Sequence, residues 1–413
     1  MGPVDLHLPL VTAVVSHRFE DTALVLGLAL VVGALLSGLA RRSFVSLTAL
    51  FVVVGFILGD GATQTLHYDA GSGFVSELAT VALIVILFRD GLEVDGEMLQ
   101  SHWHLPLRKL VLAMPITAGI VAVATRWLTG LSWTESFLVG ALLSPTDPVL
   151  SSSVVTNPRV PRLVRHSLNL ESGLNDGLAL PAVLALAAVL SPQGHGLVWW
   201  RFVLENLAFG FAVGGLIGTI AARLIPRESE DQALFGLGTA FAAYGLATLL
   251  PNGNGLIAVF VAAIALGVQR PQMRAAFERQ AGAMVEIVKL GIFVVFGSLL
   301  TLHGLFGSGW AAVAVVAITL LVARPVAVFA ALAGTTTDTA TRAFMSWFGP
   351  KGVATMTFSI LVLSEQVSHG SKIFNLAALT VFTSIIVHGL SDTGGANWLA
   401  KRADRGEQQP NGA

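Results

Sequence analysis

The most constraining feature of this sequence is a nearly unbroken succession of apolar segments, each about 20 residues long, which is the length an α-helix needs to cross a bilayer. Only 12% of the 413 residues are charged and the mean hydropathy is +0.75, whereas soluble domains average about 25% charged residues. The chain is therefore predicted to be an all-α polytopic membrane protein, embedded in a lipid bilayer and without a nucleic-acid partner.

Hydropathy predicts about thirteen membrane spans. They cover residues 22–40, 44–60, 73–91, 104–126, 133–156, 166–191, 199–223, 231–250, 255–270, 281–303, 308–333, 341–365 and 373–391. Residues 22–391 therefore form one transmembrane domain. Residues 1–21 are too short and interrupted to span, and we expect them to lie along the membrane interface. Residues 392–413 are polar, so we expect a short, disordered cytoplasmic tail.

The placement of lysine and arginine predicts the orientation in the membrane. When the connections are assigned alternately to two sides, one side holds only Arg18, Arg126, Arg201 and Lys372, and the spans hold Lys289, Arg324 and Lys351. All other lysines and arginines lie on the opposite side. Because positive charge is retained in the cytoplasm, we expect the N-terminus outside and the C-terminus inside, in a plasma membrane such as the bacterial inner membrane.

Several classes of chemistry are not supported. The chain has no cysteine, which excludes disulfides, thiol catalysis and cysteine-based metal sites. The histidines near span ends lack the spacing of a metal site. No G-x-S-x-G elbow or hydrolytic triad is visible, and the first 20 residues lack the basic region of a cleavable signal peptide. We therefore expect neither an enzyme nor a bound cofactor or resident metal.

The motif SPTDPV, residues 144–149, interrupts the fifth predicted span. Pro145 and Pro148 lack an N–H and clash with the preceding turn, so the helix is expected to break around Thr146 and Asp147. Unwound backbone at membrane depth persists only where it lines a buried or watery cavity, and broken spans supply ion ligands in secondary transporters. The alternative is a proline kink with Asp147 as a helix cap, but serine or asparagine would cap at a lower charge cost.

The following span carries four polar residues in one sector. Ser172 and Asp176 share a helix face, as do Glu171 and Asn175, because the members of each pair are four residues apart. A carboxylate in the bilayer core is costly unless it is paired, hydrated or protonated, so such groups are candidates for function. Oxygen ligands suit hard cations such as sodium. The alternative is a polar seam that only joins helices.

A second interruption lies in the twelfth predicted span, where Lys351 stands between Pro350 and Gly352. Spans five and twelve occupy corresponding positions in two six-helix halves joined by span seven, and this linking span inverts the second half. Paired interruptions of this kind mark the binding site of alternating-access transporters. Opposed half-helix ends would meet at the crossing, where Asp147 and Lys351 would neutralise their partial charges.

Three other charges fall inside spans. Arg324, in the eleventh span, needs a buried anionic partner. Glu286 and Lys289, three residues apart in the tenth span, are expected to form a self-contained ion pair with a structural role.

Four motifs together resemble those of the monovalent cation/proton antiporter family 1, the NhaP-type sodium/proton exchangers: FRDGLEVD (88–95), SPTDPV (144–149), LESGLNDG (170–177) and GPKGVA (349–354). The hydropathy match covers essentially the whole chain. The resemblance implies thirteen helices in two inverted six-helix repeats with crossed, broken helices. It also implies a membrane-embedded homodimer whose core domain moves against a dimerisation domain. The family commonly has arginine where this chain has Lys351, and lysine lacks the fork geometry of a guanidinium.

The resemblance also implies roles at the ion site. Asp176 would bind the cation and the proton, and Asn175 would bridge towards the broken helix. Thr146, Ser172 and Glu171 would contribute oxygens near the ion. Because Asn175 is neutral, a single carboxylate would carry either a cation or a proton, which gives one-for-one, electroneutral exchange.

The same resemblance assigns structural roles to the remaining charges. Asp147 and Lys351 would balance the ends of the broken helices, and Arg324 would pair with Glu171.

The predicted function is secondary antiport of a monovalent cation against H+ by alternating access, with Na+ first and Li+ or K+ as alternatives. A K+/H+ antiporter or efflux system is the alternative reading, although the glycine-rich nucleotide-binding tail of a regulated efflux system is not seen. A cation channel lined by the same acids is a further alternative, but symmetric crossed breaks favour a carrier.

Overall fold

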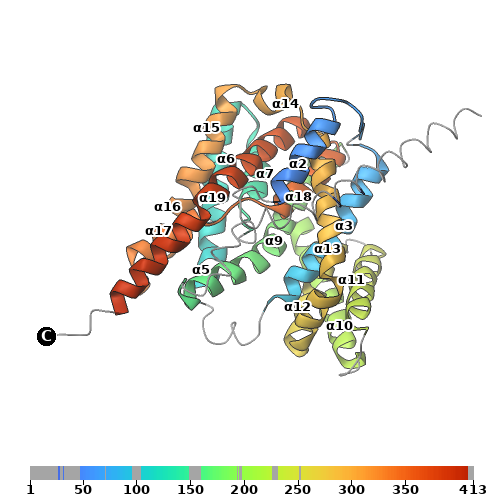
Figure 1. The fold of residues 1–413 in the computed structure, drawn as a ribbon. Helices are drawn as coiled ribbons and strands as arrows, with labels where there is room; N and C mark the ends of the chain where they lie inside the picture. Colours follow the sequence, from blue (N-terminus) through green and yellow to red (C-terminus); the bar gives the residue numbers. More distant parts are fainter. Residues whose placement is uncertain are drawn as a thin grey trace, which may run out of the picture.

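The structure is a computed structural model and describes Gly27, Val31 and residues 47–69, 71–94, 104–147, 160–192, 194, 198–225, 231–250 and 253–407. Over these residues the chain is helical without a strand (Figure 1), which confirms the predicted fold class. The helices are α2 (Leu47–Leu58), α3 (Gly73–Leu92), α5 (His104–Arg108), η1 (Lys109–Ala113), α6 (Met114–Thr129), α7 (Trp133–Leu143), α9 (Arg162–Leu190), α10 (Trp199–Leu224), α11 (Gln232–Thr248), α12 (Gly255–Gln269), α13 (Gln272–Ser298), α14 (Leu302–Phe306), α15 (Trp310–Ile318), η3 (Thr319–Ala323), α16 (Arg324–Ala331), α17 (Thr339–Trp347), α18 (Val353–Ser364) and α19 (Gly370–Glu407).

The predicted spans and the helices agree in position. From residue 44 onward, the described part of each predicted span holds one helix or consecutive helical segments. Among the described residues, six helices are long and apolar enough to cross a membrane, and four shorter apolar helices accompany them. Residues 1–21 and all of span 22–40 except Gly27 and Val31 lie outside the described part, so the count of thirteen stays a prediction.

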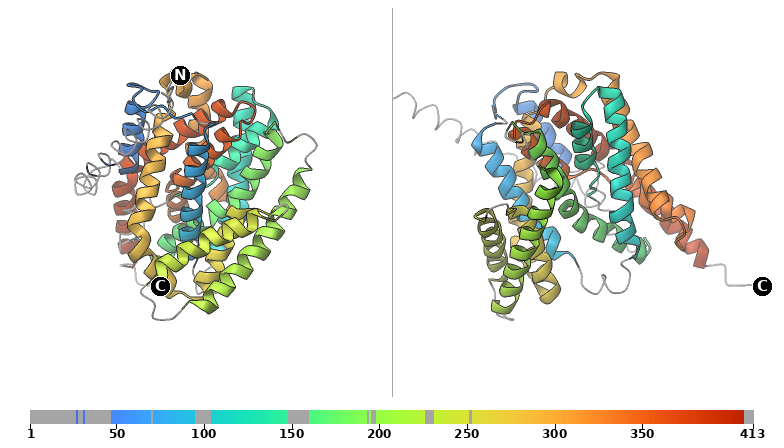
Figure 2. Two further views of the ribbon diagram at one scale, coloured as in Figure 1. Left: turned by 90° about the vertical axis from the view of Figure 1, so that its right-hand side faces the viewer. Right: turned by 180° about the vertical axis from the view of Figure 1, so that it is seen from behind.

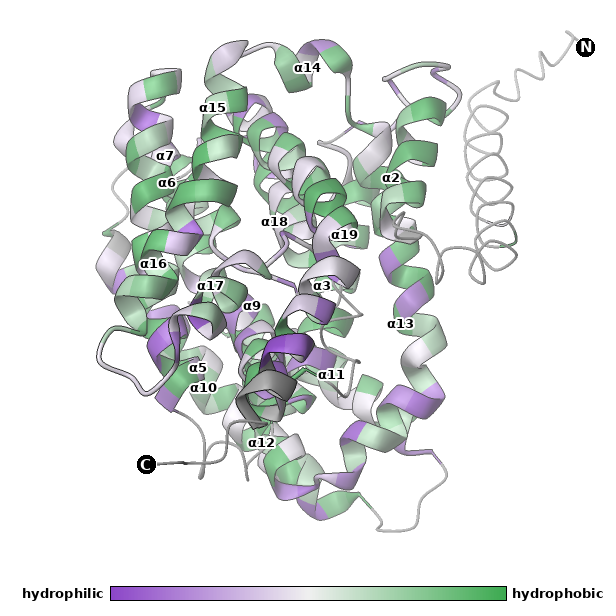
Figure 3. Ribbon diagram, turned by 60° about the vertical axis from the view of Figure 1, so that its left-hand side comes forward, coloured by the Kyte–Doolittle hydropathy of each residue, from purple (hydrophilic) through white to green (hydrophobic). Residues whose placement is uncertain are grey.

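The distribution of side chains is that of a protein in lipid. Large apolar residues such as Trp310, Leu249 and Leu234 are strongly exposed. Hydrophilic residues gather at the end of the molecule that holds α5 and the start of α13 (Figure 3). Water-exposed surfaces of soluble proteins rarely carry large contiguous apolar patches. The helices therefore bury polar groups inside the bundle and turn apolar side chains towards the bilayer.

Close helix packing depends on small residues. α10, α11 and α12 pack together on one side of the molecule (Figure 2). Gly214 and Gly218, four residues apart on α10, face α12: a Cβ at Gly214 would lie 2.4 Å from the Ala258 carbonyl oxygen, and one at Gly218 would lie 2.3 Å from that of Ala262. Small residues at this spacing let two helix backbones approach in lipid, where the hydrophobic effect does not drive helices together.

Two helices are interrupted where the prolines predict it. α7 is followed by non-helical backbone through Asp147, beyond which residues 148–159 lie outside the described part. α17 and α18 are separated by the non-helical residues 348–352. Pro145 and Pro350 cannot donate a backbone hydrogen bond, so each stops its helix.

Two π-helical segments occupy corresponding places in the fourth and eleventh predicted spans. η1 precedes Met114 and Pro115, and η3 precedes Arg324 and Pro325, within the similar sequences LVLAMP and LLVARP. A proline removes one backbone hydrogen bond and crowds the preceding turn, where the wider π pattern relieves the clash. This likeness is what an inverted repeat requires, and the repeat itself stays a prediction.

The polar tail differs from the expectation of disorder. Residues 392–407 continue α19 beside α17 (Figure 1), and residues 408–413 lie outside the described part. Ala396 and Leu399 are buried in an apolar cluster with Phe348 of the α17–α18 connection. One face of this polar helix therefore packs against the apolar cluster. The face has so few apolar residues that the composition of the tail does not reveal it.

Candidate functional site

The two interrupted helices cross in direct contact. The Asp147 amide donates to the Pro350 carbonyl at 2.8 Å. Thr355 Oγ1, in the first turn of α18, donates to the Leu142 carbonyl of α7 at 3.0 Å. Thr146, between these contacts, is only 3% exposed. Part of the polar backbone of one break is thus satisfied by the other break, as unwound backbone at membrane depth requires.

Each broken helix meets a charge of the sign that offsets its dipole. The Lys351 ammonium donates to the carbonyls of Pro145 at 3.1 Å and Ser144 at 3.4 Å, directly beyond the C-terminus of α7. The Asp147 carboxylate approaches the N-terminus of α18, because a Cβ added to Gly352 would lie 2.6 Å from Asp147 Oδ2. Cations stabilise helix C-termini and anions stabilise helix N-termini. This geometry suits the balancing role that the resemblance implies for Asp147 and Lys351.

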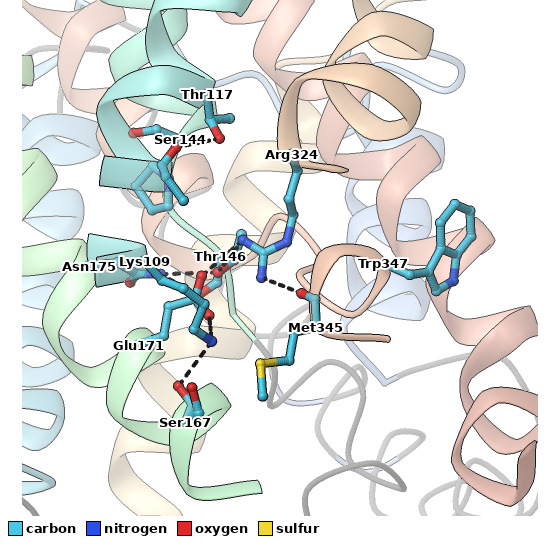
Figure 4. A network of polar contacts seen from close by, with 12 residues as sticks. Lys109, Thr117, Ser144, Thr146, Ser167, Glu171, Asn175, Arg324, Met345 and Trp347 are labelled. Carbon is cyan, nitrogen blue, oxygen red and sulfur yellow. Dashed lines mark hydrogen bonds and ion pairs between the residues drawn. The ribbon is translucent and has the colours of Figure 1, made fainter. Parts of the chain in front are cut away.

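Glu171 on α9 accepts hydrogen bonds from two buried cations (Figure 4). Arg324 Nη1 donates to Oε1 at 2.9 Å, which is the pairing that the resemblance implies, and Lys109 Nζ donates to Oε2 at 2.5 Å. Arg324 Nη2 also donates to the Met345 carbonyl near the end of α17 at 3.2 Å. The side chains of Glu171 and Arg324 are 7% exposed and that of Lys109 is 0% exposed. Charge-assisted hydrogen bonds in so dry a place are strong.

Lys109 is a residue that the sequence did not reveal. We expected it in a positively charged cytoplasmic connection because it follows Arg108 at the start of a span, but it begins η1 and is buried. Since both Glu171 oxygens are taken by cations, the geometry favours a structural role for Glu171 over direct contact with the ion. No sequence pattern links Lys109 to Glu171, which lie 62 positions apart.

Asn175 joins α9 to the break in α7. Asn175 Nδ2 donates to the Thr146 carbonyl at 2.8 Å and lies 3.2 Å from Thr146 Oγ1. Asp176 is 6% exposed, and its carboxylate forms no hydrogen bond or ion pair with the residues that the structure describes. Ser172, one turn earlier on the same face, is half-buried. Asp176 is therefore a buried carboxylate that remains available to a ligand.

Asp90 on α3 is a second acid near this carboxylate. It is 6% exposed and accepts from Arg89 Nη2 at 2.8 Å and from Arg89 Nε at 3.1 Å. α3 closes against α9 at Gly173, where a Cβ would lie 3.2 Å from the Asp90 carbonyl oxygen. Gly173 and Asp176 are three residues apart on α9, so Asp90 stands beside the site. The sequence could have indicated this acid, because the third predicted span, residues 73–91, places Asp90 inside the membrane.

The predicted ion pair between Glu286 and Lys289 is wrong. Glu286 is exposed, Lys289 is only 5% exposed, and the two side chains form no ion pair. Spacing of three residues permits such a pair, but packing turns one side of α13 inward and leaves the other outside.

A fold in which two interrupted helices cross at the level of buried carboxylates defines the class of secondary cation transporters. Comparison with known families agrees with this class. The family of sodium/hydrogen exchangers, in its transmembrane part, matches residues 27–393, and the chain belongs to this family. Among the described residues, no group of three or more His, Cys, Asp or Glu could hold a resident metal ion.

Individual relatives share the whole transmembrane region at low identity. The chain is 23% identical over 385 residues to a K+/H+ antiporter NhaP of Alkalimonas amylolytica, covering 92% of this chain and 67% of that protein. It is 27% identical over 379 residues to the K+/H+ antiporter NhaP2 of Shewanella oneidensis, covering 90% and 65%. The chain thus spans about two thirds of the length of these curated relatives. The structure of the sodium proton antiporter MjNhaP1 from Methanocaldococcus jannaschii at pH 8 has the same fold, with a TM-score of 0.81, 19% identity, and coverage of 93% of this chain and 99% of that one.

Proposed function

We propose that the protein exchanges a monovalent cation for a proton across the membrane by alternating access. The observation that carries this proposal is the Asp176 carboxylate, which is buried beside the crossing and has no partner among the described residues. In the proposed cycle, Asp176 binds either a cation, together with oxygens of Thr146 and Ser172, or a proton. Either ligand neutralises the carboxylate, whereas the bare charge resists crossing because its burial is costly.

The neighbour of this carboxylate supports one-for-one exchange. Asn175 is neutral and its amide is committed to Thr146, so it adds no second charge for the ion to balance. A single carboxylate that holds one cation or one proton at a time makes the exchange electroneutral. Asp147 and Lys351, the opposite charges at the crossing, balance each other both when the site holds a cation and when it holds a proton.

Na+ and K+ are the two candidate substrates. The solved structure of the same fold is titled a sodium proton antiporter, which supports Na+. The curated relatives are named K+/H+ antiporters, which supports K+ as the second candidate. Carboxylate, hydroxyl and carbonyl oxygens suit both ions.

We further infer that the protein acts as a homodimer in the plasma membrane, with its N-terminus outside and its C-terminus in the cytoplasm. The asymmetry of lysine and arginine supports this orientation, and the family resemblance supports the dimer.

The test is proton movement in proteoliposomes driven by an imposed gradient of Na+ or of K+, followed with a pH-sensitive dye. We expect wild type to move protons in response to at least one of the two ions. Asp176→Asn removes the charge with little change in shape, so exchange should disappear. Glu286→Gln, which changes an exposed acid on α13, should keep wild-type exchange. Full exchange by Asp176→Asn would overturn the proposal.

A further inference from the structure

An apolar groove between α17 and α19, which lie side by side (Figure 1), has no part in the proposed cycle. Its volume is about 430 Å³, within the range of roughly 300–1,000 Å³ that is usual for ligand pockets. The walls are formed mainly by the aromatic and small residues Phe344, Trp347, Phe348, Gly394, Gly395 and Trp398. Walls of this composition suit an apolar occupant.

Two adjacent glycines of α19 shape this groove. A Cβ at Gly395 would lie 2.3 Å from Phe348 Cζ, so the α19 backbone approaches this ring closely. Gly394 is exposed, and a Cβ there would meet nothing within 4 Å. At the end nearer the crossing, Trp347 Nε1 donates to Ser391 Oγ at 2.9 Å and joins the two helices. The space beside Gly394 is therefore open, while the walls around it are held in place.

The other end of the groove reaches the membrane surface. α19 has 38 residues, which makes it roughly 57 Å long at 1.5 Å per residue, whereas the hydrocarbon core is about 30 Å thick. The last turns of α19 therefore reach the interface, where tryptophan is enriched. Trp398, on the groove wall, is 47% exposed.

Positive charges continue the α19 wall beyond Trp398. Lys401 and Arg402 follow Trp398 by three and four residues, so they share its helix face, and both are exposed. Arg402 Nε lies 3.7 Å from Oδ2 of Asp338, the residue that caps α17, so part of its charge is offset. The two cations together outweigh this one acid.

We propose that the groove binds an anionic phospholipid, with an acyl chain between α17 and α19 and the phosphate beside Lys401 and Arg402. In the orientation proposed above, this end faces the cytoplasmic leaflet, whose anionic lipids attract such charges. A second copy of the chain is disfavoured as the occupant, because a two-fold contact would bring two identical cationic ends together at the same depth.

The acyl chain is tested by filling the groove. Phosphatidylglycerol or phosphatidylcholine is titrated into delipidated protein in detergent, and bound lipid is counted by native mass spectrometry. Wild type should bind phosphatidylglycerol more tightly than phosphatidylcholine. Gly394→Leu puts a side chain into the open space and should lose this binding. Gly238→Leu is the matched control and should bind as wild type does, because Gly238 is also an exposed helical glycine whose Cβ would meet nothing within 4 Å.

The headgroup is tested by changing the charges at the end of the groove. Lys401→Gln should weaken binding of phosphatidylglycerol about 5-fold, whereas Lys401→Arg should leave it unchanged. Asp338→Asn should tighten it, because the variant removes an anion and asparagine can still accept the cap hydrogen bond from the Thr341 amide. Binding of phosphatidylcholine should not respond to any of these changes.

Three outcomes would overturn the proposal: equal binding of the two lipids by wild type, wild-type lipid binding by Gly394→Leu, or a response to charge that is absent or reversed. Loss of a dimer in Gly394→Leu with unchanged lipid binding would assign the groove to a second copy. If Gly394→Leu does not fold, the opposite effects expected of Lys401→Gln and Asp338→Asn decide the question. Transport does not enter these measurements, so their failure would leave the proposed function standing.

Discussion

At the scale of single residues, Glu171 is a buried carboxylate that pairs with two buried cations. One carboxylate lies between Arg324 and Lys109, so the three groups carry a formal net charge of +1. The consequences of removing each member are therefore unequal. Without Lys109, a neutral ion pair remains. Without Glu171, two buried cations face each other with no anion between them.

We predict that Glu171→Gln destabilises the protein more than Lys109→Met does. Loss of the shared carboxylate should cost about 3–5 kcal/mol, the usual cost of breaking a buried pair. Lys109→Met keeps the bond from Arg324 to Glu171 and fills similar space, so its cost should be clearly smaller. Thermal unfolding of both variants in detergent, followed by tryptophan fluorescence, measures the difference. Equal stability of the two variants would contradict the shared role of Glu171.

Some contacts of single residues were predictable from the sequence, and the burial of two lysines was not. The hydrogen bond from Asn175 to Thr146 joins two motifs that were both visible in the sequence. The ion pair of Arg324 with Glu171 was implied by the resemblance to the NhaP-type exchangers. Lys109 and Lys289 were misjudged because the inward face of a helix depends on its neighbours in space. In lipid, apolar residues occur on both faces, so hydrophobic periodicity does not reveal which side is buried.

At the scale of elements, the crossing depends on glycines that leave room for charged side chains. A Cβ at Gly349 would lie 2.0 Å from Arg324 Nε. We predict that Gly349→Ala displaces the guanidinium, destabilises the protein by about 1–3 kcal/mol through overpacking, and reduces exchange. Gly291→Ala is the control, because a Cβ at that position on α13 meets nothing within 4 Å. Its effect should stay within about 1 kcal/mol.

Thermal unfolding and proteoliposome exchange of the two alanine variants test this role of the crossing. Wild-type exchange by Gly349→Ala would mean that the Arg324 guanidinium need not sit against the break between α17 and α18.

Elements were more predictable than contacts. Proline and glycine marked both interruptions, and hydropathy placed the helices from residue 44 onward. The end of α19 was not predictable, because residues 392–407 have a polar composition and are held by a narrow face. On that face, the apolar residues Ala396 and Leu399 pack into the cluster that contains Phe348.

At the scale of the whole molecule, the orientation in the membrane decides which way the site opens. The positive-inside rule assigns the connection between α2 and α3 to the outside and the start of α13 to the cytoplasm. Lys109 was counted as a cytoplasmic charge and is buried, so it no longer contributes to this asymmetry. The assignment survives this loss, because many other lysines and arginines lie on the same side.

The absence of cysteine from the sequence allows a direct test of orientation. Ala62→Cys, in the α2–α3 connection, and Gln272→Cys, at the start of α13, each introduce a single thiol at an exposed position. In intact cells, a membrane-impermeant maleimide should label the first variant and not the second, and both should react once the cells are opened. The reverse pattern would place the N-terminus in the cytoplasm. Cation-driven proton uptake and release would then exchange sides, while the chemistry at Asp176 would stay the same.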